Sequence, residues 1–447
     1  MVSDSAPPRY SSEKGTMNRN ELPHPWQPSR RTFLKAALGA AGALSTAGLL
    51  SGCTGGVDPH VITLGSRLSD KNAKLGVQDV VGMFQQQSGA AVRINSVDST
   101  SFQENVNNYL QGTPDDVFTW MSGYRMKYFA DKGLVDDVSS VWQAHGSGFS
   151  DSFREASTGT DGRQYLVPFF YYPWAVFYRP SLWQQRGYAP PKTFDEWVAL
   201  SKRMQSDGLT PIGFGVRDGW PPFGTFDYLD LRLNGVDFHR SLLAGDVSWT
   251  DNRVRSVFDT WREILPFHQP QPLGRKMSEA QQALLNKEVG MLVAGMFVAQ
   301  SFPAGPDRED LDFFAFPELD SAVGTSAVEA PMDGFMMRKD PRNLGGAQQF
   351  LSFLTNADAA VAYAKQDPQA IPAHRDADLS SFPPLVQKSA ALVQGAGSIT
   401  QFLDRDTRPD FASVVMIPAM QQFLGNPNDV DGLVRSIERQ KAAVFGQ

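Results

Sequence analysis

Short apolar runs alternate with longer amphipathic stretches in the part of the sequence that follows residue 59. The runs have the length of buried strands, whereas the stretches between them carry apolar residues at helical spacing, as at Val77, Val80 and Phe84. The expected strands are 60–64, 91–94 and 116–120, and the expected helices are 70–87 and 101–111. Strands that alternate with helices form βαβ units, so this order predicts an α/β fold with a mostly parallel sheet.

The later part of the sequence continues with mixed elements. Phe169–Tyr178 is a strongly aromatic run that we interpret as a strand. Thr193-Phe194-Asp195-Glu196 forms a capping box, which predicts that a helix begins after Thr193 and ends near Gly208. Further strands are expected at 289–294 and 312–316, and further helices at 347–354 and 432–445.

The N-terminal region combines a basic pair, a short apolar stretch and a cysteine. Ser29-Arg30-Arg31-Thr32-Phe33-Leu34-Lys35 resembles a twin-arginine export signal, and the apolar stretch 36–52 is shorter than the roughly 20 residues that span a membrane. Leu50-Ser51-Gly52-Cys53 resembles a lipobox. We therefore expect 1–52 to be removed as a signal peptide with Arg30 and Arg31 as its export signal. Cys53 would then carry lipid, and 53–59 would tether the chain to the outer face of the cytoplasmic membrane.

Length, charge and cysteine content restrict the classes of protein that remain. Removal of 1–52 leaves a chain longer than the roughly 250–300 residues of a single core, which favours two lobes. The chain of 447 residues carries a net charge of −7, whereas nucleic-acid-binding proteins are normally basic. Cys53 is the only cysteine in the sequence, so neither an intrachain disulfide nor a cysteine-based metal cluster can form.

Six motifs in a fixed order carry a resemblance to one protein family. They are G-T-P-D-D-V-F at 112–118, D-G-R-Q-Y-L-V-P with V-F-Y-R at 161–168 and 176–179, P-P-K-T-F-D-E-W at 190–197, N-K-E-V-G-M-L-V-A-G-M-F at 286–297, F-L-S-F-L-T at 350–355, and I-P-A-H at 371–374. Together they resemble the extracellular solute-binding proteins of ABC importers (family 1), in the large group that binds carbohydrates. The resemblance spans nearly the whole chain after residue 59.

The resemblance implies a periplasmic-binding-protein-like fold of two α/β lobes, a hinge and an interlobe ligand cleft that closes around its ligand. Lobe one would comprise 60–167 plus 308–356, and lobe two 168–307 plus 357–447. The hinge crossings would lie near Val167-Pro168, Pro306 and Asn356. The chain would be a monomer that captures a carbohydrate, with an oligosaccharide as the favoured kind, without a cofactor or metal, and that delivers it to the membrane permease subunits of an ABC importer.

Some residues depart from the family pattern. Val289 and Phe297 replace the alanine and tryptophan that the family often has. Three stretches lie outside the pattern altogether: 224–228, 234–235 and 237–239. We interpret these three stretches as the mark of a subgroup with its own ligand.

A sugar presents apolar C–H faces and polar hydroxyl edges, so its site needs aromatic rings and aimed polar groups. The aromatic candidates lie at predicted strand ends and in loops: Trp120, Tyr172, Trp174, Trp220 and Phe297. Three other tryptophans fit the apolar faces of helices and are assigned to the core: Trp183, Trp197 and Trp261. Trp220 stands between Gly219 and Pro221, which predicts a loop position where aromatic residues often bind ligands.

The polar candidates are chosen for hydroxyl recognition. Arg67 follows the first strand, where ligands approach this kind of sheet. Asp227 and Asp333 are carboxylates that can each accept two hydroxyl hydrogen bonds. His374 is the fourth candidate, whereas Asp115 is expected to orient the loop before the third strand.

Two other classes of protein fit an exported aromatic cleft. A secreted glycosidase-like enzyme would use paired carboxylates, which the 48 Asp and Glu residues do not exclude by number. No G-x-S-x-G, H-E-x-x-H or P-loop motif occurs in the sequence, so we favour a binding protein over an enzyme. A tethered sensor with the same fold and no transport role would have the same sequence features.

Overall fold

The computed structural model describes residues 60–446. The predicted export signal at Arg30 and Arg31, the lipidation site at Cys53 and the tether 53–59 lie outside the described residues. Among the helices of residues 60–446, none has the length and apolar content needed to cross a membrane.

The larger of the two main sheets has seven strands in the order β12-β5-β11-β3-β1-β2, with β4 beside β11. The strands are β1 (Ile62–Ser66), β2 (Val92–Ser96), β3 (Val117–Met121), β4 (Val135–Asp136), β5 (Val167–Tyr171), β11 (Met332–Arg338) and β12 (Ile371–Pro372). β1 pairs in parallel with β2 and β3, as the βαβ pattern predicts, and β11 joins in the opposite direction. All five residues of β1 are buried, which fits its apolar and small side chains.

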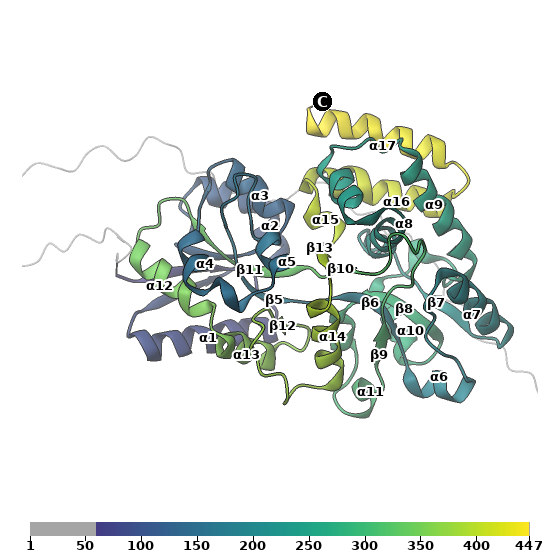
Figure 1. Cartoon of the computed structure of the whole chain (residues 1–447), viewed down its shortest axis with the longest axis horizontal. Coiled ribbons are helices and arrows are strands. Elements are labelled where there is room, and N and C mark those ends of the chain that lie inside the picture. The colour runs from purple at the N-terminus through teal and green to yellow at the C-terminus, as the bar shows by residue number, and fades with distance from the viewer. Residues whose placement is uncertain (1–59, 447) are drawn as a thin grey trace, which may run out of the picture. The chain divides into compact units, whose positions relative to one another are not determined.

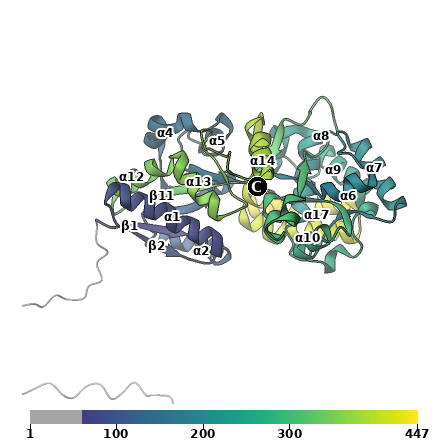
Figure 2. The same cartoon turned by 90° about the horizontal axis from the view of Figure 1, so that it is seen from below.

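Helices cover both faces of this sheet. They are α1 (Lys71–Ser88), α2 (Ser99–Gln111), α3 (Tyr124–Asp131), α4 (Ser139–His145), α5 (Asp151–Ala156), α12 (Leu344–Leu354) and α13 (Ala357–Gln366). α1 and α13 lie side by side although they are far apart in the sequence (Figures 1 and 2). Gly89 ends α1 in the left-handed conformation, where its amide donates to Gln85 O.

The smaller main sheet has four strands in the order β7-β8-β6-β9. Its strands are β6 (Trp174–Tyr178), β7 (Thr210–Gly213), β8 (Val289–Gly295) and β9 (Asp312–Phe314). The helices of this lobe are α6 (Pro180–Arg186), α7 (Phe194–Ser206), α8 (Pro222–Ala244), α9 (Asn252–Ile264), α10 (Met277–Leu285), α11 (Pro306–Glu309), α16 (Ile417–Gly425) and α17 (Val430–Phe445). The predicted helix start is confirmed, since Thr193 Oγ1 accepts from Glu196 N.

A narrow two-stranded ribbon lies between the two sheets (Figure 1). It pairs β10 (Ala327–Glu329) in parallel with β13 (Ser398–Thr400). α14 (Pro384–Gln394) precedes β13, and the short helix α15 (Leu403–Asp406) follows it. The described residues therefore form two α/β lobes joined by this ribbon and by the β5–β6 connection, as the fold prediction requires.

All three crossings between the lobes fall later in the chain than the sequence predicted. β5 pairs in the larger sheet and β6 in the smaller one, so the first crossing lies at Tyr172-Pro173 rather than Val167-Pro168. β9 pairs with β6, which moves the second crossing past Pro306. β12 pairs with β5 and α13 packs on α1, which moves the third crossing past Asn356.

The misplaced first crossing has a physical reason. Pro168 reads as a strand breaker, but it lies opposite Gly334, where the register of the β5–β11 ladder shifts. A proline is tolerated at such an irregularity because its missing N–H interrupts no regular ladder bond. The aromatic run therefore forms two strands separated at Pro173 instead of one strand that begins after a hinge.

His268 is a buried histidine of lobe two that is expected to make the free energy of unfolding depend on pH. Its ring lies 4.3 Å from the ring of Phe214, and Nδ1 has no hydrogen-bond partner among residues 60–446. Burial lowers the pKa of His268 to about 3, whereas an unfolded histidine titrates near 6.5. Unfolding therefore takes up a proton between these pH values, so the stability that the neutral ring contributes is lost as pH falls from about 6.5.

We expect the His268→Phe variant to lack this contribution. The free energy of unfolding of the wild type should fall relative to the variant by on the order of 1.4 kcal/mol per pH unit between about pH 6 and 4. Urea unfolding at pH 7, 6 and 5 measures the difference. Parallel pH profiles for the two chains would contradict the buried neutral state.

Candidate ligand-binding site

A cavity of about 630 Å³ lies between the lobes, where five of the nine predicted ligand residues meet. These five are Trp120, Tyr172, Trp174, Trp220 and Phe297. Trp120 comes from β3 of lobe one, whereas Trp174 begins β6 of lobe two. Residues from both lobes therefore line one cleft, although 54 positions separate these two tryptophans in the sequence.

Trp174 is the centre of the aromatic wall. Its ring stacks on Phe402 with a centroid distance of 4.6 Å and an interplanar angle of 15°. Trp220 and Phe297 meet the same ring edge to face, at centroid distances of 6.2 Å and 5.6 Å. Gly224 permits this packing, because a Cβ there would lie 2.4 Å from the Trp174 ring. The wall thus presents rings in several orientations around one space.

Polar groups reach the same cleft from α2, α3 and α15. Arg125 donates to Gln103 Oε1 at 2.9 Å, and its Nη2 lies 4.0 Å from Asp404 Oδ2. Four buried polar atoms of the lining have no hydrogen-bond partner among the described residues: Trp120 Nε1, Arg125 Nε, Asn107 Oδ1 and Asp404 Oδ1. Buried polar atoms are nearly always satisfied, so these four atoms are candidates for hydrogen bonds to a ligand.

Arg67 and Asp333 do not line the cleft but support one of its walls. Asp333 forms ion pairs with Arg67 and, at 3.2 Å, with Arg405. Arg405 Nη2 also donates to the hydroxyl of Tyr172 at 2.8 Å. Burial, and after it the nearby Arg405, lowers the pKa of Arg67. This network holds Tyr172 in the cleft wall. Arg67 and Asp333 therefore support an aromatic ring of the cleft and do not line the cleft themselves.

Asp227 and His374 lie away from the cleft. Asp227 is fully buried in lobe two, where its Oδ2 accepts from Leu403 N at 2.9 Å. His374 lines another cavity in lobe one, with its ring 5.7 Å from that of Phe149. Both residues were chosen for the chemistry of their side chains, whereas packing against neighbouring elements places these side chains elsewhere. Asp115 is structural as predicted, since it accepts from Tyr109 Oη at 2.8 Å.

The sequence reasoning missed the contribution of the segment that carries Phe402, Asp404 and Arg405. No element or candidate was predicted there, because 401–406 has neither a helical nor a strand period. The available signal was an aromatic residue beside alternating charges. Three further lining residues were not among the candidates: Gln103 and Asn107 lie in the helix expected at 101–111, and no element was predicted at Arg125.

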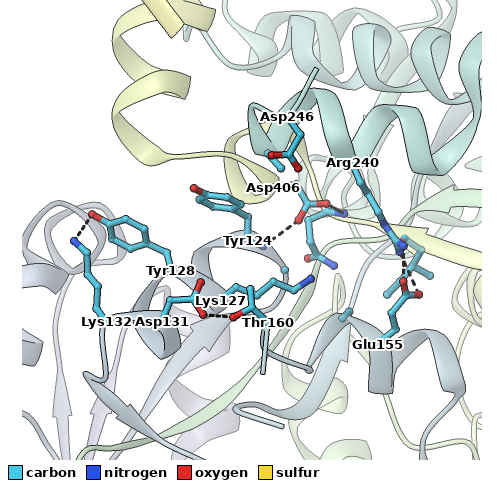
Figure 3. A pocket seen from close by; sticks show the side chains of 15 residues that line it. Tyr124, Lys127, Tyr128, Asp131, Lys132, Glu155, Thr160, Arg240, Asp246 and Asp406 are labelled. Atoms are coloured by element: carbon cyan, nitrogen blue, oxygen red, sulfur yellow. Dashed lines mark hydrogen bonds and ion pairs between the residues drawn. The ribbon is translucent and has the colours of Figure 1, made fainter. Parts of the chain in front are cut away.

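A second interlobe cavity, of about 560 Å³, lies on the other face of α3 (Figure 3). Tyr124, Lys127 and Tyr128 line it from α3, whereas Arg125 and Phe129 of the same helix line the aromatic cleft. The lobes are in contact here, because Arg240 of α8 pairs with Glu155 of α5. Asp406 Oδ1 accepts from Tyr124 N at 3.2 Å. α3 and α15 thus separate two interlobe cavities.

Comparison with known proteins places this fold and cleft in a family. Residues 70–361 match the bacterial extracellular solute-binding protein family. The solute receptor AcbH, whose structure is described as showing an exclusive preference for β-D-galactopyranose, is 39% identical and superposes with a TM-score of 0.81 over 86% of this chain and 98% of its own. The α-glucosides-binding protein AglE of Rhizobium meliloti is 24% identical over 79% of this chain and 81% of its own.

The chain belongs to the bacterial extracellular solute-binding protein family. A Pyrococcus horikoshii relative, named as an uncharacterised ABC transporter extracellular-binding protein, is 22% identical over 75% of this chain and 73% of its own. The family description gives these proteins an extracytoplasmic location, and the relatives are named as binding proteins. Within residues 60–446, no group of three or more His, Cys, Asp or Glu side chains is arranged to hold a metal ion.

Proposed function

We propose that this chain captures a neutral hexopyranose, with β-D-galactopyranose as the first candidate, and delivers it to an ABC importer. The observation that carries the proposal is the cleft itself, in which aromatic rings from both lobes surround buried polar atoms that have no partner within residues 60–446. AcbH, at 39% identity over nearly its whole length, supports galactose as the first probe. AglE, named for the binding of α-glucosides, supports a sugar as the ligand, and the Pyrococcus relative supports a role beside an ABC transporter.

The lining matches the two kinds of surface that a pyranose presents. Trp174, Trp220 and Phe297 offer ring faces and edges for the C–H surface. Asp404 Oδ1 and Asn107 Oδ1 can accept from hydroxyl groups, whereas Trp120 Nε1 and Arg125 Nε can donate to them. A hydroxyl group both donates and accepts hydrogen bonds. A lining that offers both donors and acceptors therefore favours a polyol over a purely cationic or purely anionic ligand.

The cleft also has room beyond one ring. Gln103, Glu104 and Asn107 of α2 line one side, and Ser413 lines another. The oligosaccharide expected from the sequence would place its outer units there, whereas a monosaccharide would occupy only the aromatic part. Comparison of D-galactose with lactose, which ends in a β-linked galactopyranose unit, distinguishes the two sizes.

Isothermal titration of the purified chain tests the sugar assignment. D-Galactose is expected to bind at one site per chain, more tightly than D-glucose, and to be recovered unchanged. Failure of galactose, glucose and lactose to bind would refute a hexopyranose site in this cleft. Consumption of the sugar during the titration would favour the glycosidase-like alternative over a receptor.

Anchoring at Cys53 is part of the same proposal. An extracytoplasmic receptor that serves a membrane permease gains local concentration from a lipid tether. Fractionation of cells that express the wild type and Cys53→Ser measures this: the wild type is expected in the membrane fraction and the variant in the soluble one. An equal distribution of the two chains would exclude a lipid anchor at this residue.

A further inference from the structure

The residues of 224–239 that lie outside the family pattern form the middle of α8. Gly235 interrupts this helix with a left-handed φ of 80°, so α8 consists of two halves that meet at Gly235. Asp227 and Asp230 lie on the first half and His239 on the second, and all three side chains are fully buried. Charged side chains are almost never buried without a paired role, so this cluster calls for an explanation.

A side-chain hydrogen bond links the two halves of α8. His239 Nδ1 lies 2.8 Å from Asp230 Oδ2, and Asn234 Nδ2 donates to Asp230 Oδ1 at 2.7 Å. Burial disfavours the charged imidazole, but the hydrogen bond to Asp230 and the charges of Asp227 and Asp230 outweigh burial and raise the pKa of His239. A charge-assisted bond of this kind is short and directional. It therefore fixes the angle between the two halves at the Gly235 break.

α15 is anchored on both halves of α8, against which it packs (Figure 1). At its start, Leu403 N donates to Asp227 Oδ2 at 2.9 Å on the first half. Beyond its end, Thr407 Oγ1 donates to Leu243 O at 2.6 Å on the second half. The two residues between these anchors that face the cleft are Asp404 and Arg405. A change in the angle at Gly235 would move one anchor relative to the other.

We infer that His239 is a positioning residue for the ligand cleft, which seats α15 by holding the two halves of α8 together through Asp230. This inference rests on the proposed function, because it takes Asp404 and Arg405 to be groups that hold or support a sugar. His239 is not among the residues that line the cleft, so it acts only through α15. The part of α8 that departs from the family pattern thus positions cleft residues through α15 and does not contact the ligand itself.

The test combines a readout without sugar and a readout with sugar. In the ligand-free chain, His239→Ala is expected to speed hydrogen exchange at the Leu403 amide, whose bond to Asp227 it loosens. With D-galactose as the probe, the same variant is expected to raise the Kd by about tenfold or more. His239→Asn keeps a donor near the position of Nδ1, so it should restore both values to within about threefold of the wild type.

His268→Ala is the matched control, since it also removes a buried histidine of lobe two but has no bond to α8 or α15 among the described residues. It is expected to lower the unfolding midpoint while leaving the Leu403 exchange rate and the galactose Kd unchanged. Equal losses of affinity in His239→Ala and His268→Ala would overturn the inference, because they would reflect general loosening.

Thr407→Val removes the second anchor without disturbing the buried cluster, and it serves if His239→Ala does not fold. Thr407→Val is also expected to weaken galactose binding. The double variant of His239→Ala and Thr407→Val should lose no more affinity than the larger of the two single losses, because both changes act through the packing of α15 on α8. Fully additive losses, or an unchanged Kd in Thr407→Val, would contradict this role. If the wild type binds no galactose but His239→Ala still speeds exchange at the Leu403 amide, the result would refute the proposed function alone.

Discussion

Replacement of Asp404 by alanine is expected to raise the Kd for D-galactose by roughly ten- to a hundredfold. The buried Oδ1 of Asp404 has no hydrogen-bond partner within residues 60–446, and the carboxylate lies at the border of the cleft. A hydrogen bond from a ligand hydroxyl to a carboxylate contributes about 1.5–3 kcal/mol, which corresponds to this change in affinity. Asp404 also lies 4.0 Å from Nη2 of the buried Arg125, so urea unfolding of the variant is measured beside its Kd to separate a loss of binding from a loss of stability.

Asp410→Ala is the matched control for this prediction. Asp410 lines the same cleft, but its two oxygens already accept from Arg408 at 3.0 Å and 2.7 Å. We therefore expect its replacement to change the galactose Kd by about threefold at most. Titration calorimetry of the two variants measures the contrast. Similar losses in both variants would mean that the net charge of the cleft, and not a specific bond to Asp404, holds the ligand.

The fold was predictable because its elements have strong local signals. The buried run of β1, the helical stripe of α1 and the capping box before α7 all lie where the sequence placed them. Lobe boundaries were not predictable in the same way, since they depend on which strand pairs with which. Whether Val167–Tyr171 joins one sheet or the other is decided by its ladder with β11, more than 160 residues away.

The same difference between local signals and long-range packing applies to the residues of the cleft. The aromatic candidates could be identified because a large ring at a predicted strand end or in a loop stands out in the sequence. Five such residues meet in one cavity. Asp404 could not be found, since its position depends on the seat of α15 on α8. Asp227 shows the converse: its carboxylate is chemically suited to a sugar, yet its hydrogen bond goes to the backbone of Leu403. Residue chemistry suggests candidates, and tertiary packing selects among them.

Trp174→Ala is expected to lower the free energy of unfolding by about 3–5 kcal/mol and to abolish measurable galactose binding. Trp174 is only 2% exposed, and its ring stacks on Phe402 beside Gly224. Loss of the ring leaves a cavity under the segment that leads into α15. Trp220→Ala is expected to weaken binding by about 1–3 kcal/mol with little change in stability, because Trp220 is half-buried in a loop.

Urea unfolding and titration with D-galactose separate these two roles of an aromatic ring. If Trp174 served only as a stacking surface, both variants would lose affinity while keeping the stability of the wild type. Trp174→Phe keeps part of the stack on Phe402 and should recover most of the stability, so it keeps binding measurable if Trp174→Ala does not fold. Unchanged affinity in both Trp174→Phe and Trp220→Ala would remove the aromatic wall from the binding site, because both variants keep the polar groups of α15.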